Sequence, residues 1–183
     1  MKNTYCKCLL YAYPNVEQLL DQLDTLAEKK ALASMDDFTP CLEQCEKILS
    51  ITEQKDVLIM IKLKTEQILS GLTHEELDLL DYKYFKQKPK EYYSGFDCSS
   101  RAYFRKQNKV LDKMSLLFEK AGFTDEWFTK ECLKNDFFVR LYAGVRERED
   151  SVKKESVKRQ KPKPISYAQS TYETVQKSCS LSA

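Results

Sequence analysis

Residues 72–111 constrain the fold of this chain most, because local start and stop signals divide them into short helices joined by a tight turn. Thr73 is followed three residues later by Glu76, which is the spacing of a capping box, so a helix is predicted to begin directly after Thr73. Pro89 lacks a backbone N–H and cannot continue that helix, whose end is therefore expected near Gln87.

A second, short helix and a third, longer one are predicted to follow. Pro89 suits the first turn of the second helix, and Gly95 suits the left-handed residue that ends it. Ser99 is a good N-cap for a third helix beginning at Ser100. Helical spacing places one set of residues on the buried face of this third helix: Tyr103, Gln107, Val110, Leu111 and Met114.

The outer face of the third helix carries the chemistry of major-groove reading. Guanidinium groups pair with guanine and amides with adenine, and small or apolar groups fit near the helix start. Between Tyr82 and Lys113, nine Lys and Arg outnumber three Asp and Glu, whereas the whole chain has a net charge of only +2. We therefore predict a recognition helix, with Lys83, Lys86, Lys88 and Lys90 as phosphate anchors and an outer face of Ser100, Arg101, Phe104, Arg105, Asn108 and Lys109.

The segments LTHEELDLLDYKYF and KEYYSGFDCSSRAYFRKQNKVLDKM together resemble region four of bacterial sigma factors and the short sigma-like regulators of phages and mobile elements. Residues 82–85 correspond to the end of the first helix, 90–93 to the second helix, and 99–106 to the start of the recognition helix. Tyr92 and Tyr93 replace the small residues usual in the second helix, and no counterpart of sigma region two is found upstream. The resemblance implies a helix-turn-helix regulator that binds double-stranded DNA, with RNA polymerase as a candidate partner.

The rest of the chain is also predicted to be helical, since it holds only four Gly and five Pro and is 32% charged. The first thirteen residues are expected to form an irregular or helical lead-in. Asn15 is predicted to cap a helix that ends near Met35. Thr39 and Pro40 repeat the start signal for a stretch that reaches Gly71, with a candidate pause at residues 50–52. This pattern predicts a long helical hairpin.

Beyond the third helix, Gly122 is expected to be a C-cap, and Thr124 and Asn135 are predicted to start two more helices. Apolar periodicity ends after Arg146. We therefore predict an all-α chain with an N-terminal helical region (1–71), a helix-turn-helix DNA-binding region (72–121), C-terminal helices on the same core (122–150) and a disordered tail that is basic and then Ser/Thr-rich (151–183).

Several function classes find no support in the residues. The seven cysteines are scattered and odd in number, so reduced thiols are expected, and neither Cys6-x-Cys8 nor Cys41-x-x-x-Cys45 has the usual spacing of a zinc knuckle. His74 is the only histidine, and no phosphate-binding glycine loop or HExxH motif occurs. No apolar run is long enough for a membrane span or a signal peptide. The prediction is a cytoplasmic protein that is not an enzyme and needs no metal or cofactor.

The leading functional hypothesis is a sequence-specific, sigma-like DNA-binding regulator of transcription. The alternative is a non-enzymatic helical adaptor whose basic surface meets an acidic protein partner, because basic amphipathic helices are also common on solvated surfaces. The apolar stripes of the N-terminal hairpin are expected to form the core. A hairpin longer than the domain that covers it would leave apolar surface for a second copy, which makes a homodimer a further hypothesis.

Overall fold

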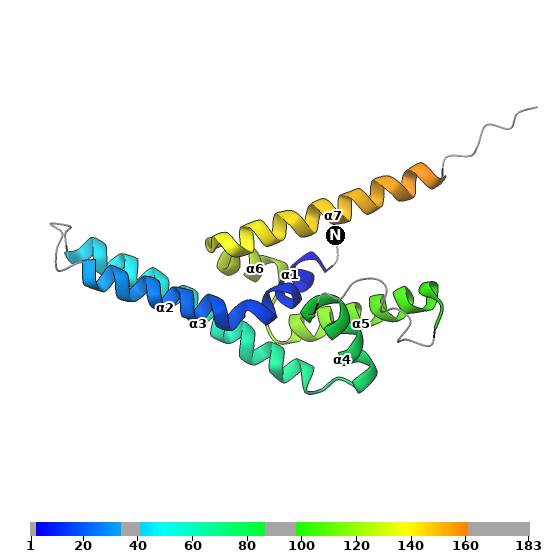
Figure 1. Ribbon diagram of the computed structural model, residues 1–183, viewed down its shortest axis with the longest axis horizontal. Helices are drawn as coiled ribbons and strands as arrows, with labels where there is room; N and C mark the ends of the chain where they lie inside the picture. Colours follow the sequence, from blue (N-terminus) through cyan, green and yellow to red (C-terminus); the bar gives the residue numbers. More distant parts are fainter. Residues whose placement is uncertain (1–2, 34–40, 87–97, 161–183) are drawn as a thin grey trace, which may run out of the picture. The chain divides into compact units, whose positions relative to one another are not determined.

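The computed structural model describes residues 3–33, 41–86 and 98–160, and all regular elements among them are helical, as predicted (Figure 1). The chain separates into two compact units, residues 1–147 and 148–183, and the functional candidates below lie in the first. The elements are α1 (Thr4–Ala12), η1 (Tyr13–Asn15), α2 (Val16–Ala33), α3 (Cys41–Leu69), α4 (His74–Leu80), η2 (Asp81–Phe85), α5 (Ser100–Lys120), α6 (Asp125–Glu131), η4 (Cys132–Lys134) and α7 (Asp136–Gln160).

Helix α1 forms the centre of the core. The side chains of Cys6, Cys8, Leu9, Leu10 and Ala12 are completely buried, and the helix contacts both α5 and η2. A helix that is apolar on every side is stable only when it is surrounded. The residues expected to form a lead-in are therefore a helix on which the neighbouring elements pack.

Helices α2 and α3 form the predicted hairpin and lie side by side. Leu23 of α2 and Ile51, Leu58 and Ile61 of α3 are buried between the helices and the core. The candidate pause at residues 50–52 is wrong: α3 is continuous there, and the Thr52 hydroxyl donates to the Ile48 carbonyl at 3.0 Å. Polar side chains bonded to the preceding turn are compatible with an unbroken helix.

The start of α2 also differs from the prediction. Instead of a cap at Asn15, the turn η1 carries the chain from α1 directly into α2. The Asn15 amide donates backwards to the Tyr11 carbonyl at 3.2 Å. The helix ends at Ala33, close to the expected Met35, and the predicted start signal at Thr39 and Pro40 lies outside the described residues.

The C-terminal helices begin at the predicted signals. Gly122, with a φ of 93°, follows α5, and the Thr124 side chain accepts from the Trp127 N–H to cap α6. Asn135 Oδ1 accepts from the Phe137 N–H at 2.9 Å where α7 begins. The rings of Phe128 and Phe138, 5.9 Å apart, hold α6 and α7 together.

Helix α7 extends further than predicted. A disordered tail was expected from residue 151, but the helix continues to Gln160, so that boundary is wrong for residues 151–160. Glu, Lys, Arg and Gln have high helix propensity and extend a helix that no longer has a buried face.

None of the described helices combines the length and apolarity needed to cross a membrane.

Replacement of Leu9 by alanine tests whether α1 is the centre of the core. Leu9 is completely buried, so Leu9→Ala should lower the free energy of unfolding by about 2–5 kcal/mol in urea denaturation. Leu32→Ala is the matched control because that side chain, on α2, is 66% exposed, and its cost should stay within about 0.5 kcal/mol. Equal losses in the two variants would contradict a core built around α1.

Candidate nucleic-acid interface

The predicted capping box at the start of α4 is present. Thr73 Oγ1 accepts from the Glu76 N–H at 3.4 Å, and the Thr73 N–H donates to Glu76 Oε2 at 2.9 Å. The helix begins at His74, as expected, and passes at Asp81 into the π-helical turn η2, where the Lys86 N–H donates to the Asp81 carbonyl at 2.8 Å. These contacts define the first helix of the predicted motif.

The predicted third helix is also present, as α5. Ser99 Oγ accepts from the Ala102 N–H at 3.3 Å, and the helix starts at Ser100. Its inner face is buried against the core, and the ring of Tyr103 lies 6.2 Å from that of Tyr82 in η2. The buried set is the predicted one, with Ser115 and Phe118 added: Tyr103, Gln107, Val110, Leu111, Met114, Ser115 and Phe118.

The outer face of α5 is exposed as predicted. Phe104 is 50% exposed although its ring lies against that of Tyr103, with centroids 5.6 Å apart. The exposed residues of this face are Ser100, Arg101, Phe104, Arg105, Asn108 and Lys109.

Carboxylates from α4 and η2 neutralise part of the basic segment. Lys106 forms an ion pair with Glu75, and Lys113 forms one with Glu76 at 2.7 Å. The remaining pair joins Lys86 to Asp81. All three carboxylates lie before Tyr82 in the sequence, so a count of charges from Tyr82 to Lys113 does not include them. The local positive charge is therefore smaller than the sequence predicts.

Lys83 is not presented to solvent with the other cations. Its ammonium donates to Gln107 Oε1 at 3.0 Å and lies 5.4 Å from the centre of the Tyr84 ring. Burial lowers the pKa of Lys83, and the positive charge of Lys7 on α1 adds to the effect. This placement does not favour the phosphate role predicted for Lys83.

Arg101, Arg105 and Lys109 remain on the exposed face of α5. Within the described part of the chain, none of the three forms an ion pair. Their spacing brings all three onto one side of the first three turns. The predicted Lys88 and Lys90, and the second helix and turn predicted from Pro89 to Gly95, lie outside the described residues.

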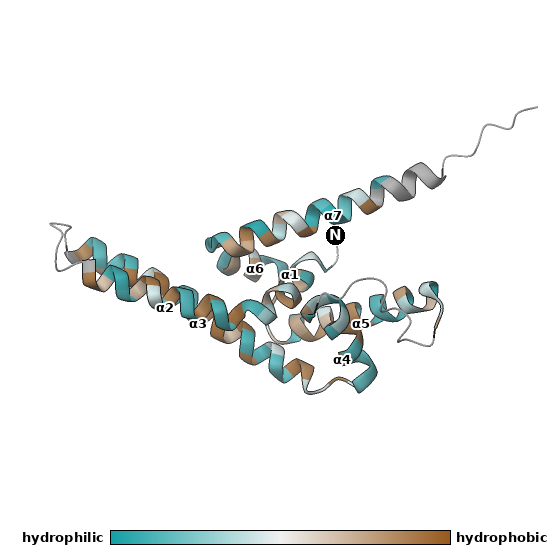
Figure 2. Ribbon diagram, in the orientation of Figure 1, coloured by the Kyte–Doolittle hydropathy of each residue, from teal (hydrophilic) through white to brown (hydrophobic). Residues whose placement is uncertain are grey.

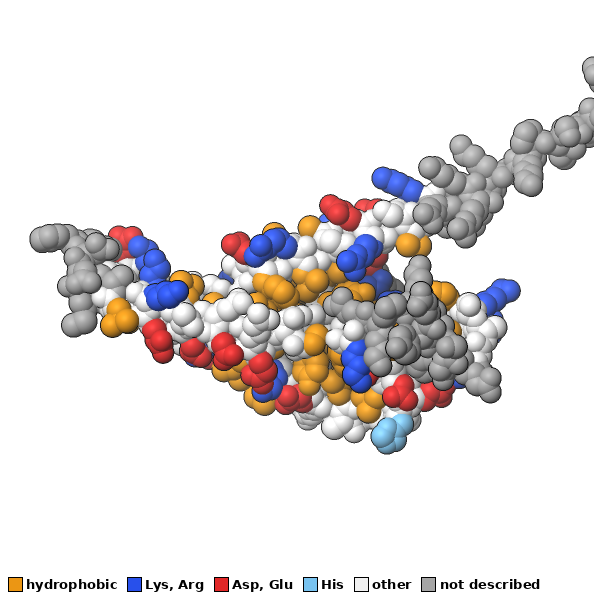
Figure 3. Space-filling view, in the orientation of Figure 1, with side chains coloured by type: hydrophobic (Ala, Val, Ile, Leu, Met, Phe, Trp, Pro, Cys, Tyr) orange, Lys and Arg blue, Asp and Glu red, His pale blue; other side chains and the backbone are white. Residues whose placement is uncertain are grey.

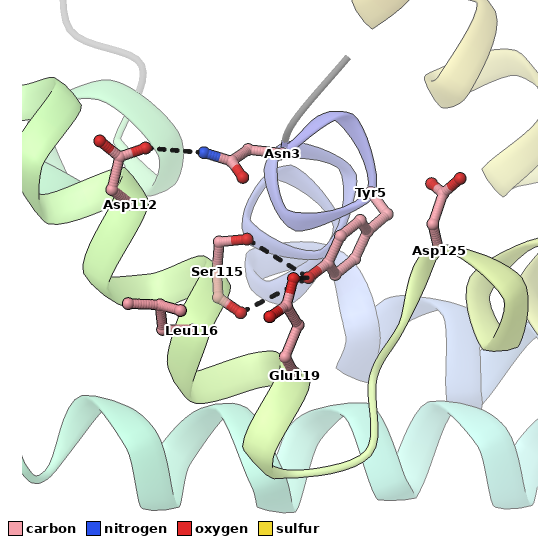
Figure 4. A pocket seen from close by; sticks show the side chains of 7 residues that line it. All are labelled: Asn3, Tyr5, Asp112, Ser115, Leu116, Glu119 and Asp125. Atoms are coloured by element: carbon pink, nitrogen blue, oxygen red, sulfur yellow. Dashed lines mark hydrogen bonds between the residues drawn. The ribbon is translucent and has the colours of Figure 1, made fainter.

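The second half of α5 holds Asp112 and Glu119 as well as Lys113 and Lys120, so the excess of positive charge ends there. A hollow of about 510 Å³ there is lined by Asn3, Tyr5, Asp112, Ser115, Leu116, Glu119 and Asp125 (Figure 4). The Tyr5 hydroxyl lies 3.3 Å from Ser115 Oγ and 3.4 Å from Glu119 Oε1, while Asn3 donates to Asp112 at 2.9 Å. These polar groups are engaged with one another, and their carboxylates would repel phosphate.

Acidic side chains also line the hairpin of α2 and α3 in a row (Figure 3). The α2 carboxylates Glu17 and Asp24 pair with lysines of α3, whereas Asp21 and Glu28 are exposed. This part of the surface does not suit nucleic acid. The start of α5 is a described face on which three unpaired cations lie in one row.

Cys6, Cys8, Cys45, Cys98 and Cys132 are free thiols. Burial is the main cause that raises the pKa of the Cys6 thiol strongly and that of Cys132 to about 12, so both stay protonated at neutral pH. Among the described residues, no group of three or more metal-ligating side chains gathers. These thiols serve as apolar core residues.

Comparison with known proteins found no matching family model, no matching curated protein and no matching solved structure.

The double role of Glu76 leads to a pH-dependent prediction. The Lys113 hydrogen bond, and then the Thr73 N–H, hold the pKa of Glu76 below its usual range. A depressed carboxyl pKa contributes stability that is present above the unfolded value of about 4.3 and is lost as pH falls through the folded value. Glu76→Gln should therefore lower the free energy of unfolding by roughly 0.5–1 kcal/mol at pH 7. The difference in this free energy between the variant and the parent should become smaller below about pH 4.

The measurement is urea denaturation at several pH values. Glu28→Gln, on the exposed side of α2, is the control and should match the parent throughout. A cost of Glu76→Gln that stays constant or grows on acidification would exclude the Lys113 and Thr73 contacts as its source.

Proposed function

We propose that this chain binds double-stranded DNA through the first half of α5 and acts as a sigma-like regulator of transcription. The observation that carries the proposal is the exposed row of Arg101, Arg105 and Lys109, which have no carboxylate partner among the described residues. The neighbouring Lys86, Lys106 and Lys113 are each paired internally. Cations that a fold leaves unpaired beside paired ones are available to an external anion.

The chemistry of the face fits a base-reading helix. Arg101 and Arg105 can each donate two hydrogen bonds to guanine O6 and N7, and the Asn108 amide can pair with adenine. Half-exposed Phe104 offers an apolar contact for a thymine methyl group. Lys109, one turn further along the helix than Arg105, suits a phosphate contact.

Packing supports the proposal by holding the helix rigidly. The inner face of α5, including Tyr103 and Gln107, is buried, so the outer side chains start from a fixed backbone. Asp112 and Glu119 further along would repel phosphates, which limits contact with DNA to the first half of the helix. Recognition helices characteristically use their N-terminal residues for base contacts.

The regulator role rests on the resemblance to sigma region four. Helix α4 starts at His74 and α5 at Ser100, as that resemblance requires. RNA polymerase is a proposed partner on the resemblance alone. A preference for one DNA sequence would distinguish a regulator from an adaptor that binds an acidic protein.

Selection from a pool of random duplexes with the purified chain provides that test. A regulator should enrich one recurrent motif, whereas an adaptor with a basic surface should bind all duplexes alike or none. Salt dependence alone does not separate the two, because both interactions are electrostatic.

Removal of the two guanidinium groups should weaken binding to the selected duplex. Arg101→Ala with Arg105→Ala should raise the dissociation constant at least tenfold in fluorescence anisotropy, since each lost base contact costs about 1–3 kcal/mol. Discrimination between the selected duplex and a scrambled one should fall in parallel.

Lys29→Ala with Lys30→Ala is the matched control, because it removes the same charge from exposed positions of α2. That variant should retain both affinity and discrimination. If the arginine variant keeps its circular dichroism spectrum and binds the selected duplex as tightly as the parent, DNA recognition by α5 is excluded.

A further inference from the structure

Helix α3 carries two apolar faces, of which only one is buried. Ile51, Leu58, Ile61 and Thr65 face the core. The opposite face holds a second stripe that we call the α3 seam. Figure 2 shows hydrophobic segments along the hairpin to which α3 belongs. The seam consists of Leu42, Cys45, Leu49, Thr52, Asp56, Ile59 and Leu63.

The seam residues follow one another at alternating intervals of three and four, and all are exposed. Leu42 is 73% exposed, Leu49 61%, Leu63 59% and Ile59 40%. Such spacing, sustained over about three heptads, is the pattern of a coiled-coil interface. A helix with apolar residues on opposite sides usually has both sides covered.

We propose that the α3 seam pairs with the α3 seam of a second copy of the chain, with the two helices antiparallel. The polar centre of the seam selects this occupant and this orientation. In a parallel pair in register, Asp56 would face Asp56 of the second copy in a poorly solvated interface, where like charges repel strongly. An antiparallel pair avoids this contact.

Antiparallel pairing centred on residue 54 makes the seam complementary to itself from Cys45 to Leu63. Cys45 then faces Leu63 of the second copy, and Leu49 faces Ile59. Thr52 faces Asp56, and in the dimer each Thr52 hydroxyl would turn its proton from the Ile48 carbonyl to that carboxylate. A twofold contact requires this reciprocity, in which each pair of residues occurs twice.

The charges beside the seam are compatible with close approach. On one edge, Lys55 and Lys62 are already paired with Asp24 and Glu17 of α2. On the other edge, half-exposed Met60 adds apolar surface. Glu53 lies close enough to Lys134 to influence it, although Glu131 is the main partner of that lysine.

The helix needs no further ordering before it associates, because α2 already holds α3 in place. A seam of this length with a polar centre should give a dimer with a dissociation constant of roughly micromolar order. The inference is independent of DNA binding and would hold equally for an adaptor.

Sedimentation velocity of the full chain across the micromolar range tests the proposal. The parent should pass from monomer to dimer as concentration rises. Leu49→Glu places a charge against Ile59 in two symmetric layers and should weaken dimerisation more than tenfold, with an unchanged circular dichroism spectrum because the side chain is exposed. Val139→Glu, at a 45% exposed position of α7, is the control and should dimerise like the parent.

The orientation has its own test through the natural thiol of Cys45. In Leu63→Cys, antiparallel pairing should give a disulfide between Cys45 of one copy and the introduced thiol of the other, identified by peptide mapping after mild oxidation. A link from Cys45 to Cys45 would overturn the antiparallel arrangement. A parent that stays monomeric, or a Leu49→Glu variant that dimerises as well as the parent, would overturn the pairing itself.

Discussion

The burial of α1 is the constraint on which the rest of the first unit depends. Seven of its nine side chains are buried, and the elements that enclose them come from distant parts of the sequence. The Tyr11 ring lies 4.7 Å from that of Tyr84 in η2, and the Tyr5 hydroxyl reaches Ser115 on α5. Because η2 and α5 of the predicted motif both pack on α1, the position of α1 sets the orientation of α5.

Side chains facing inward and outward on α5 have different roles. The inner residues contact η2 and the core, and the exposed ones include the cations proposed to meet DNA. Ion pairs from α4 to α5, such as Lys113 with Glu76, connect the two helices without engaging the outer face. The structure thus separates the residues that hold the helix in place from those available to a ligand.

Local signals in the sequence predicted helix boundaries well. The capping box at Thr73, the caps at Ser99 and Thr124, and the glycine at 122 were all confirmed, because each depends on residues a few positions apart. The exposed face of α5 followed from helical periodicity in the same way.

Long-range features were beyond such reasoning. The role of α1 could not be predicted because its nine residues are too few to show a periodic face. The inward turn of Lys83 and the neutralisation of Lys106 by Glu75 depend on contacts between helices whose packing is not encoded locally. Residues 151–160 form a helix without an apolar stripe, so apolar periodicity could not predict that the helix continues to Gln160.

The charge in the first turn of α5 is opposite to what the peptide dipoles of the helix favour, although Lys120 in the last turn agrees with them. The first turn contains Arg101 and no acidic residue, although the positive end of the helix dipole lies there and disfavours a cation. An anion held at this end would interact favourably with the guanidinium group and with the unsatisfied backbone N–H groups together. In the proposed complex with DNA, a phosphate at the start of α5 would offset this unfavourable placement of Arg101, and DNA binding would then stabilise the first turn of the helix.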